Sequence, residues 1–268
     1  MPPDPSVDEA NAAFWNELCG TTLAKGIGAT GRTPEDLGRF DRAYLDVYPY
    51  LDAYLPMDEL VDARVLEIGL GYGTLGNQFM EAGARYTGVD ISPGPVAMMQ
   101  YRIGLADRSD TCAVLEASAL ALPFEESDFD FVYSIGCLHH TGDLPRAVSE
   151  VRRVLRPGGR AVVMVYSRWS ARRVVTAPRR ALRRLFHHRR DAQATGGNLY
   201  DLDQEGNAPP HTHFVSVRDA RRVFREFSSM RVDRRNIDIV RFPPGRRWLL
   251  AMRVDRIVGL DLYVQAVK

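Results

Sequence analysis

Short apolar segments alternate with longer amphipathic segments over most of this chain. The short segments are bounded by glycine, proline or acidic residues, which is typical of buried strands, and a late one alternates apolar and polar positions as a half-buried strand does. The predicted strands are residues 64–68, 85–90, 111–116, 129–135, 160–166, 230–239 and 260–267. Apolar residues recur at helical spacing over residues 74–82, 93–105, 145–155, 216–227 and 243–258. This alternation predicts an α/β fold with a doubly wound, mostly parallel sheet that helices cover on both faces.

The region before the first strand has a different pattern. Residues 1–10 predict a disordered lead-in, and residues 10–25 have helical spacing. Residues 26–38 are rich in glycine and predict a loop. Residues 39–55 carry a strong apolar stripe with a period of about 3.6 residues, in which Pro49 predicts a kink or a break.

Residues 168–215 interrupt the alternation after the fifth predicted strand. The part from Trp169 to Arg190 is rich in arginine and has no acidic residue, and Pro178 divides it into two short helical pieces. Three interpretations remain open: a solvated face, a rim that binds an acidic substrate, or a contact with an anionic membrane surface or nucleic acid. Because the aromatic residues are not interleaved with the arginines as base stacking requires, we expect no nucleic-acid partner.

Composition limits the remaining possibilities. A chain of 268 residues with 45% hydrophobic residues can form one large domain, or a domain with a small cap. The formal net charge of +1 gives no overall attraction to nucleic acid or to an anionic membrane. The three cysteines have neither disulfide nor metal-ligand spacing, so we expect a reduced, cytoplasmic location. We expect no signal peptide, and no apolar run is long enough to span a bilayer.

One stretch carries the clearest candidate chemistry. The first strand ends at Ile68, and Gly69, Gly71 and Gly73 follow, whose missing Cβ atoms let the backbone turn sharply beside a ligand. A strand, a glycine turn and a helix together present backbone N–H groups to a ligand. Asp90 ends the second strand about twenty residues later, where a carboxylate can accept hydrogen bonds from both hydroxyls of an adenosine ribose.

The glycines also fit a dinucleotide-binding fingerprint that starts at Gly71, but the glycine that follows the strand directly is Gly69. With Glu67 two positions before Gly69, the chain resembles the class I S-adenosylmethionine-dependent methyltransferases, whose first motif is an acid followed by alternating glycines. Further motifs come in the order and spacing of that family, and the resemblance spans residues 60–167. These motifs are Leu122-Pro123-Phe124, Phe129-Asp130-Phe131-Val132 and Leu155-Arg156-Pro157-Gly158-Gly159.

The resemblance implies further detail of the fold. It implies a seven-stranded Rossmann-like sheet whose last two strands form an antiparallel pair at one edge. It also implies a helical lid in residues 1–59, followed by an S-adenosylmethionine-binding domain in residues 60–268. This domain carries the basic helical insertion, residues 168–215, after its fifth strand.

The resemblance implies S-adenosyl-L-methionine as the cofactor and gives roles to residues around it. Gly69 and Gly71 let the chain approach the methionine part and the ribose, and Glu67 orients that loop or holds the methionine ammonium. Many relatives have an aspartate where this chain has Ser118, whose hydroxyl can still accept from the adenine amino group. The expected cofactor-binding residues are Glu67, Gly69, Gly71, Asp90, Ile91, Ser118, Ala119 and Ile135, and no metal site is expected.

Catalytic residues are harder to predict. Methyl transfer from a sulfonium depends mainly on alignment and on exclusion of water, and a base is needed only when the acceptor carries a proton. We expect Cys137 to pack rather than to react as a nucleophile. The candidate bases are His139 and His140 after the fourth strand, and His211 and His213 before the helix that precedes the sixth strand.

The leading hypothesis is an enzyme that transfers a methyl group from S-adenosylmethionine to an O, N or C atom of a small-molecule metabolite, with an anionic acceptor as one option. The alternatives are a different use of the same cofactor, such as an intramolecular cyclisation, and a non-catalytic cofactor-binding protein. A nicotinamide dehydrogenase is an alternative only because it would have the same type of fold. We expect a monomer or a homodimer, with a contact to an anionic surface as a minor possibility.

Overall fold

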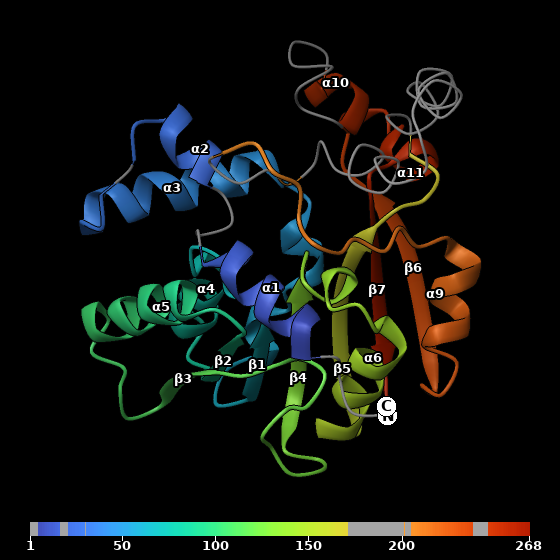
Figure 1. Ribbon diagram of the computed structural model, residues 1–268, viewed down its shortest axis with the longest axis horizontal. Helices are drawn as coiled ribbons and strands as arrows, with labels where there is room; N and C mark the ends of the chain where they lie inside the picture. The colour runs from blue at the N-terminus through green and yellow to red at the C-terminus, as the bar shows by residue number, and fades with distance from the viewer. Residues whose placement is uncertain (1–4, 17–20, 30, 171–200, 202–204, 238–245) are drawn as a thin grey trace.

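The computed structural model describes residues 5–16, 21–29, 31–170, 201, 205–237 and 246–268. Within this part of the chain, seven strands form one sheet in the order β3-β2-β1-β4-β5-β7-β6 (Figure 1). The strands are β1 (Arg64–Ile68), β2 (Arg85–Asp90), β3 (Cys112–Glu116), β4 (Phe129–Ile135), β5 (Leu155–Tyr166), β6 (Ser229–Arg235) and β7 (Asp261–Val267). The first five strands are parallel, and β7 runs antiparallel to both β5 and β6. The predicted Rossmann-like sheet with an antiparallel edge is confirmed.

Helices cover both faces of this sheet. One face carries α4 (Thr74–Glu81) and α5 (Pro93–Leu105), and the other carries α6 (Leu144–Val154) and α9 (Val217–Val223). The predicted cap of α9 is present, because Ser216 and Asp219 form a reciprocal capping box. The remaining helices are α1 (Pro5–Trp15), α2 (Thr21–Gly26), α3 (Pro34–Val47), α10 (Arg246–Ala251) and α11 (Asp255–Val258), with short 3₁₀ turns η1 (Leu51–Tyr54), η2 (Met57–Glu59) and η3 (Leu138–His140).

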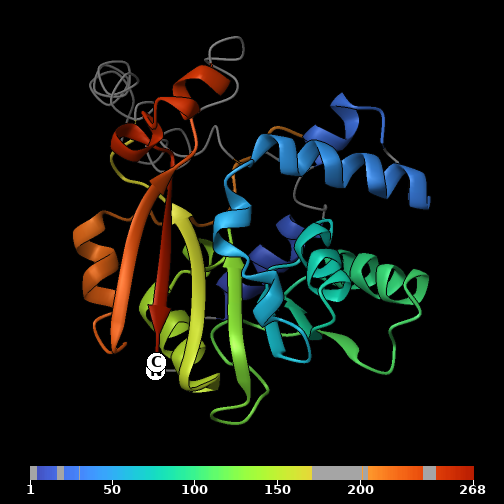
Figure 2. The same cartoon turned by 180° about the vertical axis from the view of Figure 1, so that it is seen from behind.

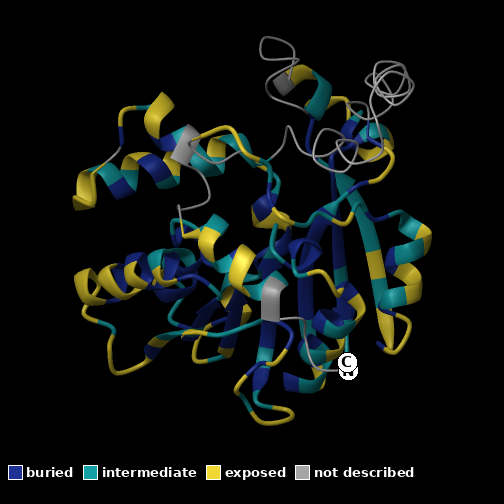
Figure 3. Cartoon of the chain, viewed as in Figure 1, coloured by how far each residue is buried: buried dark blue, intermediate teal, exposed yellow. Residues whose placement is uncertain are grey.

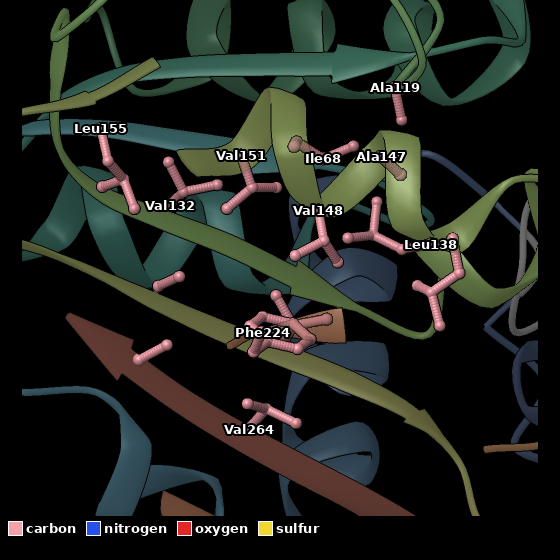
Figure 4. Close-up of a cluster of buried hydrophobic side chains, with 14 of the residues drawn as sticks. Ile68, Ala119, Val132, Leu138, Ala147, Val148, Val151, Leu155, Phe224 and Val264 are labelled. Atoms are coloured by element: carbon pink, nitrogen blue, oxygen red, sulfur yellow. The ribbon is translucent and has the colours of Figure 1, made fainter. Parts of the chain in front are cut away.

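Two apolar layers hold the helices to the sheet, because successive strand residues point to opposite faces. Leu66 and Val132 belong to the layer under α6 and α9, where Val148 and Phe224 close the packing (Figure 4). Val65 belongs to the opposite layer, in which η1, seen from behind in Figure 2, packs beside α4 and α5. Each buried side chain of this size contributes about 1.5–3 kcal/mol, so the sheet is a firm support for the loops at its carboxyl edge.

The N-terminal region departs from the predicted pattern. The prediction of disorder over residues 1–10 is wrong from Pro5 onward, because α1 begins there with Pro5 in its first turn and Asp8 near its positive end. The predicted loop also ends early, because Thr33 accepts a hydrogen bond from Asp36 N and starts α3 at Pro34. The predicted break near Pro49 is present, since α3 ends at Val47.

The fifth strand also begins earlier than predicted, at Leu155 instead of residue 160. The backbone of Gly158 and Gly159 exchanges hydrogen bonds with Lys268, and Arg156 forms an ion pair with Asp130. These long-range contacts extend the segment, whereas the sequence pattern predicted only a helix stop. The predicted helix over residues 243–258 is observed as the two shorter helices α10 and α11, as far as it is described. Residues 171–200 of the arginine-rich insertion, and residues 238 and 239 of the predicted sixth strand, lie outside the described residues.

Candidate active site

The loop after β1 takes a backbone path that only glycine follows without strain. Gly69, Gly71 and Gly73 all have positive φ angles, of 87°, 52° and 76°. A Cβ atom on Gly69 would lie 2.5 Å from the Cβ of Cys137, which follows β4. The glycines therefore let the loop after β1 pass directly against the loop after β4, at the edge where ligands bind in this type of sheet.

Asp90, at the end of β2, holds this loop in place. Its Oδ2 accepts a hydrogen bond from Leu70 N at 2.8 Å, and its Oδ1 accepts one from Ser92 N at 3.0 Å. Burial raises the pKa of Asp90 to about 6 although these backbone donors favour the charged form. The backbone of Ile91 and the side chain of Ser92 also interact with this carboxylate, which lines the cavity.

Glu67 lies beneath the loop in a fully enclosed position. The hydroxyl of Tyr86 donates a hydrogen bond to its Oε2 at 2.6 Å. Burial raises the pKa of Glu67 to about 8, and the charge of Asp90 adds to this effect. At neutral pH, and without a cation beside it, Glu67 is therefore a protonated carboxylic acid.

The raised pKa of Glu67 predicts how stability depends on pH. Between its ordinary pKa of 4.5 and about 8, the folded state keeps a proton that the unfolded state loses. Glu67 makes its full contribution to the free energy of unfolding below pH 4.5. This contribution decreases by about 1.4 kcal/mol per pH unit as the pH rises toward about 8. Glu67→Gln keeps an acceptor for Tyr86 but has no proton to lose, so this pH dependence is removed. The free energy of unfolding of the variant should therefore exceed that of the wild type, by an amount that grows from about pH 5 to about pH 7. Urea denaturation of the cofactor-free protein measures both curves, and parallel curves would contradict the assignment.

A cavity of about 1030 Å³, its open mouth included, lies over these residues. Its lining is mostly apolar with a few polar and acidic groups, which is typical of a small-molecule site. All eight expected cofactor-binding residues line it: Glu67, Gly69, Gly71, Asp90, Ile91, Ser118, Ala119 and Ile135. Ser118 Oγ accepts a hydrogen bond from Leu120 N and still faces the cavity.

Helix α1 forms part of the cavity wall and is fixed on both sides of it. On the β4 side, Asn11 Nδ2 donates to His140 O at 2.9 Å. On the β2 side, Ser92 Oγ donates to Ala12 O at 3.0 Å, and Gly94 N donates to Asn16 Oδ1 at 2.9 Å. This helix, dark blue in Figure 1, therefore bridges the loops after β2 and β4, with Asp8, Asn11 and Trp15 lining the cavity.

Helix α3 is tied to the glycine loop by a buried ion pair. Arg102 of α5 donates from Nη1 and Nη2 to the two carboxylate oxygens of Asp41, each at 2.8 Å. Arg102 Nε also donates to Tyr72 O in the loop, and Thr74 Oγ1 donates to Asp41 Oδ1. The ring of Phe40 stacks on that of Tyr72 at a centroid distance of 4.1 Å. A single network thus fixes α3, the glycine loop and α5 relative to one another.

The four candidate histidines lie together, but only His140 lines the cavity. His140 Nδ1 lies 2.8 Å from His211 O, so this nitrogen carries the proton and Nε2 is the basic one. His139 is fully buried against Tyr166, and its burial lowers the pKa of its ring well below the ordinary value. The backbone N–H of His213 donates a hydrogen bond to His139 O. Burial lowers the pKa of His211 as well.

Asp201 is a partner of His140 that the sequence did not indicate. Its Oδ2 lies 3.5 Å from His140 Nε2, and the hydroxyl of Tyr166 donates to both of its oxygens. Cys137 lines the cavity beside Gly69.

The cavity fits S-adenosylmethionine in three respects. The carboxylate of Asp90 lines it at the end of β2, and a carboxylate can accept hydrogen bonds from a ribose diol. The glycine loop brings the backbone close, and a Cβ on Gly69 could not be accommodated. The acid of Glu67 lies at the same wall and can ionise beside an ammonium group.

Comparison with known proteins agrees with this geometry. Residues 66–163 match the family model of the methyltransferase domain. A sterol 4-C-methyltransferase of Caenorhabditis elegans is 30% identical over 125 residues, which are 47% of this chain and 37% of that protein. The 27-O-demethylrifamycin SV methyltransferase of Amycolatopsis mediterranei is 36% identical over 98 residues, which are 36% of each chain. The chain thus matches little more than a third of the length of these relatives.

The solved structures extend the likeness of fold to most of the chain. An S-adenosylmethionine-dependent methyltransferase of Mesorhizobium loti superposes with a TM-score of 0.56 at 21% identity, over 82% of this chain and 97% of that one. The matching fold, the methyltransferase domain over residues 66–163 and the cavity agree with one another. Residues 66–163 match a methyltransferase domain, and the methyltransferase domain and the S-adenosylmethionine-dependent methyltransferases of the same fold imply S-adenosylmethionine as the cofactor.

Proposed function

We propose that this protein transfers a methyl group from S-adenosylmethionine to a small-molecule acceptor. The observation that carries the proposal is the pairing of Asp90 with the glycine loop at the wall of one large cavity. When bound, the cofactor supplies an electrophilic methyl group. The residues of this chain bind it, align the acceptor and exclude water, which are the contributions that this displacement needs.

The wall of the cavity supports a neutral acceptor with apolar surface. Trp15, Phe40 and Tyr44 contribute aromatic side chains, and the described lining residues include no arginine or lysine. The hypothesis of an anionic acceptor depended on the arginine-rich insertion, whose residues 171–200 lie outside the described residues. Methyltransferases for a sterol and for a rifamycin are among the relatives, and such acceptors would suit an aromatic wall.

The lid and the location are parts of the same proposal. Residues 1–59 act as the lid through α1 and α3, whose hydrogen bonds connect them to the loops of the cavity. Cys112 is a thiol, which suits a cytoplasmic location. Within the described residues, no helix is both long and apolar enough to cross a bilayer.

The nature of the reaction is tested by its products. Calorimetry should detect binding of S-adenosylmethionine, and turnover with a panel of ring-containing hydroxyl and carbon acceptors should release S-adenosylhomocysteine. The [4+2]-cyclase SpnF has the same fold, with a TM-score of 0.53 at 16% identity, so the fold alone does not select methyl transfer. Release of methylthioadenosine would indicate another displacement, and binding without turnover would indicate a non-catalytic protein.

His140 is the base when the acceptor is a hydroxyl group. His140→Asn keeps a donor near His211 O and removes Nε2, so kcat should fall by about 10²–10⁴ while cofactor affinity stays the same. Formation of S-adenosylhomocysteine measures the rate, and calorimetry measures the affinity. The control is His213→Ala, since His213 is exposed and does not line the cavity. Equal losses in both variants would exclude the proposed role.

A further inference from the structure

The helical excursion between β6 and β7 carries apolar side chains on its outer side. Asp255 is only 2% exposed and faces Arg235, with Nη1 and Oδ2 3.7 Å apart. Ile257, two residues later, is 70% exposed, and Trp248 and Met252 are 64% and 57% exposed. A helix that served only to cover its own domain would bury these apolar groups and expose the carboxylate. Because the apolar side chains are exposed and the carboxylate is buried, this surface is suited to contact an apolar environment outside the chain.

The backbone of this excursion is fixed to the sheet, so its outward face has a defined direction. Arg234 Nη1 donates to Ile257 O at 3.1 Å, and Leu260 N donates to Asn236 O at 2.9 Å. The guanidinium of Arg235 also lies over the rings of Tyr50 and Tyr54, 5.9 Å from each centroid. The exposed side chains of α11 are therefore presented by an anchored element, and α10 directly precedes it along the chain (Figure 3).

The end of β5 adds a second tryptophan with the same reversed burial. Ser167 and Ser170 are almost completely buried, whereas Trp169 between them is 61% exposed. Ser167 N donates to Leu260 O at 2.7 Å, which places this segment beside the chain that leaves α11. We call the four exposed side chains the apolar rim: Trp169, Trp248, Met252 and Ile257.

The charge around the apolar rim is positive although the whole chain is nearly neutral. Arg253 and Arg256 are exposed on the excursion, and residues 246–258 contain four arginines and one aspartate. Elements that lie in the interface of an anionic bilayer typically combine tryptophan and arginine side chains with apolar groups.

We propose that the apolar rim docks on an anionic membrane surface. Apolar side chains enter the acyl boundary, and the arginines interact with the lipid headgroups, each adding about fivefold to the affinity. A nucleic acid is a poorer match, because Met252 and Ile257 offer no ring on which a base can stack. The rim lies at the edge where β1, β4 and β5 end, which is also the edge of the cavity. This inference goes beyond methyl transfer and does not depend on it.

Vesicle sedimentation with the full-length protein tests the proposal. The wild type should bind vesicles of equal parts phosphatidylcholine and phosphatidylglycerol, and should not bind pure phosphatidylcholine. Trp248→Ser combined with Ile257→Ser should lower the affinity at least tenfold, and Arg256→Glu about fivefold or more. The matched controls are Val61→Ser and Arg85→Glu, exposed residues near the amino ends of β1 and β2, which should bind as the wild type does.

Each outcome decides the matter. Loss of binding in the rim variants alone, with a blue shift of tryptophan fluorescence in the wild type, supports the proposal. The proposal is overturned if the wild type does not bind anionic vesicles, or if the rim variants bind them equally well. It is also overturned if the protein binds single-stranded RNA and not vesicles. Calorimetry with S-adenosylmethionine accompanies every variant, so a failure of cofactor binding is distinguished from a failure of docking.

Discussion

Asp90→Ala is expected to weaken the binding of S-adenosylmethionine at least tenfold. The variant removes the acceptor for the ribose hydroxyls, and hydrogen bonds to a charged group contribute about 1.5–3 kcal/mol. It also removes the acceptor for Leu70 N and Ser92 N, so the glycine loop loses its tie to β2. Because the pKa of Asp90 is about 6, the affinity of the wild type should itself fall as the pH is lowered through that value.

Isothermal calorimetry at neutral pH measures this effect. Asp90→Asn keeps one carbonyl acceptor and should lie between the wild type and alanine. Asp110→Ala, at an exposed position next to β3, is the matched control and should bind normally. Circular dichroism establishes that each variant is folded, and an unchanged affinity in folded Asp90→Ala would refute the assignment.

Asp41→Ala is expected to lower the free energy of unfolding by about 3 kcal/mol, because it leaves the charge of Arg102 buried without its partner. The Arg102 side chain is 3% exposed and that of Asp41 is 13% exposed, so water cannot replace the lost contact fully. Arg102 Nε would still contact Tyr72 O and Phe40 would still stack on Tyr72, but α3 would lose its ion pair with Arg102 and its hydrogen bond from Thr74. Cofactor affinity should therefore fall together with stability.

A double-mutant cycle separates the ion pair from other effects. Arg102→Met alone and Asp41→Leu alone should both be destabilising, whereas the double variant should recover much of the loss, since apolar residues of similar size replace buried ion pairs well. Chemical denaturation gives the four free energies. If the two single effects simply add, the residues do not act as a pair.

The sequence predicted the features of this site that depend on neighbours along the chain. Gly69 and Asp90 could be placed because a strand followed by a glycine turn, and an acid at the end of the next strand, are local patterns. The contacts of Asn11 with His140 and of Arg102 with Asp41 join residues 129 and 61 positions apart, and no local pattern indicates such pairs. Arg102 in particular looks like an ordinary polar residue of a helix until α3 packs over it.

The missed start of α1 at Pro5 has a different physical reason. Pro5 and Asp8 were available as signals of a helix N-terminus, but the short, proline-rich start has little capacity to bury apolar area on its own. Its helix is stabilised by contacts at the edge of the sheet. The same applies to the extension of β5 through Gly158 and Gly159, which depends on the far end of the chain at Lys268.

The bridge that α1 makes across the cavity has a consequence for the timing of each catalytic cycle. A ligand that leaves past α1 requires this helix to release the loops after β2 and β4, and three side-chain hydrogen bonds oppose that movement. If this release limits turnover, kcat measures the opening of α1 and not the chemistry beneath it.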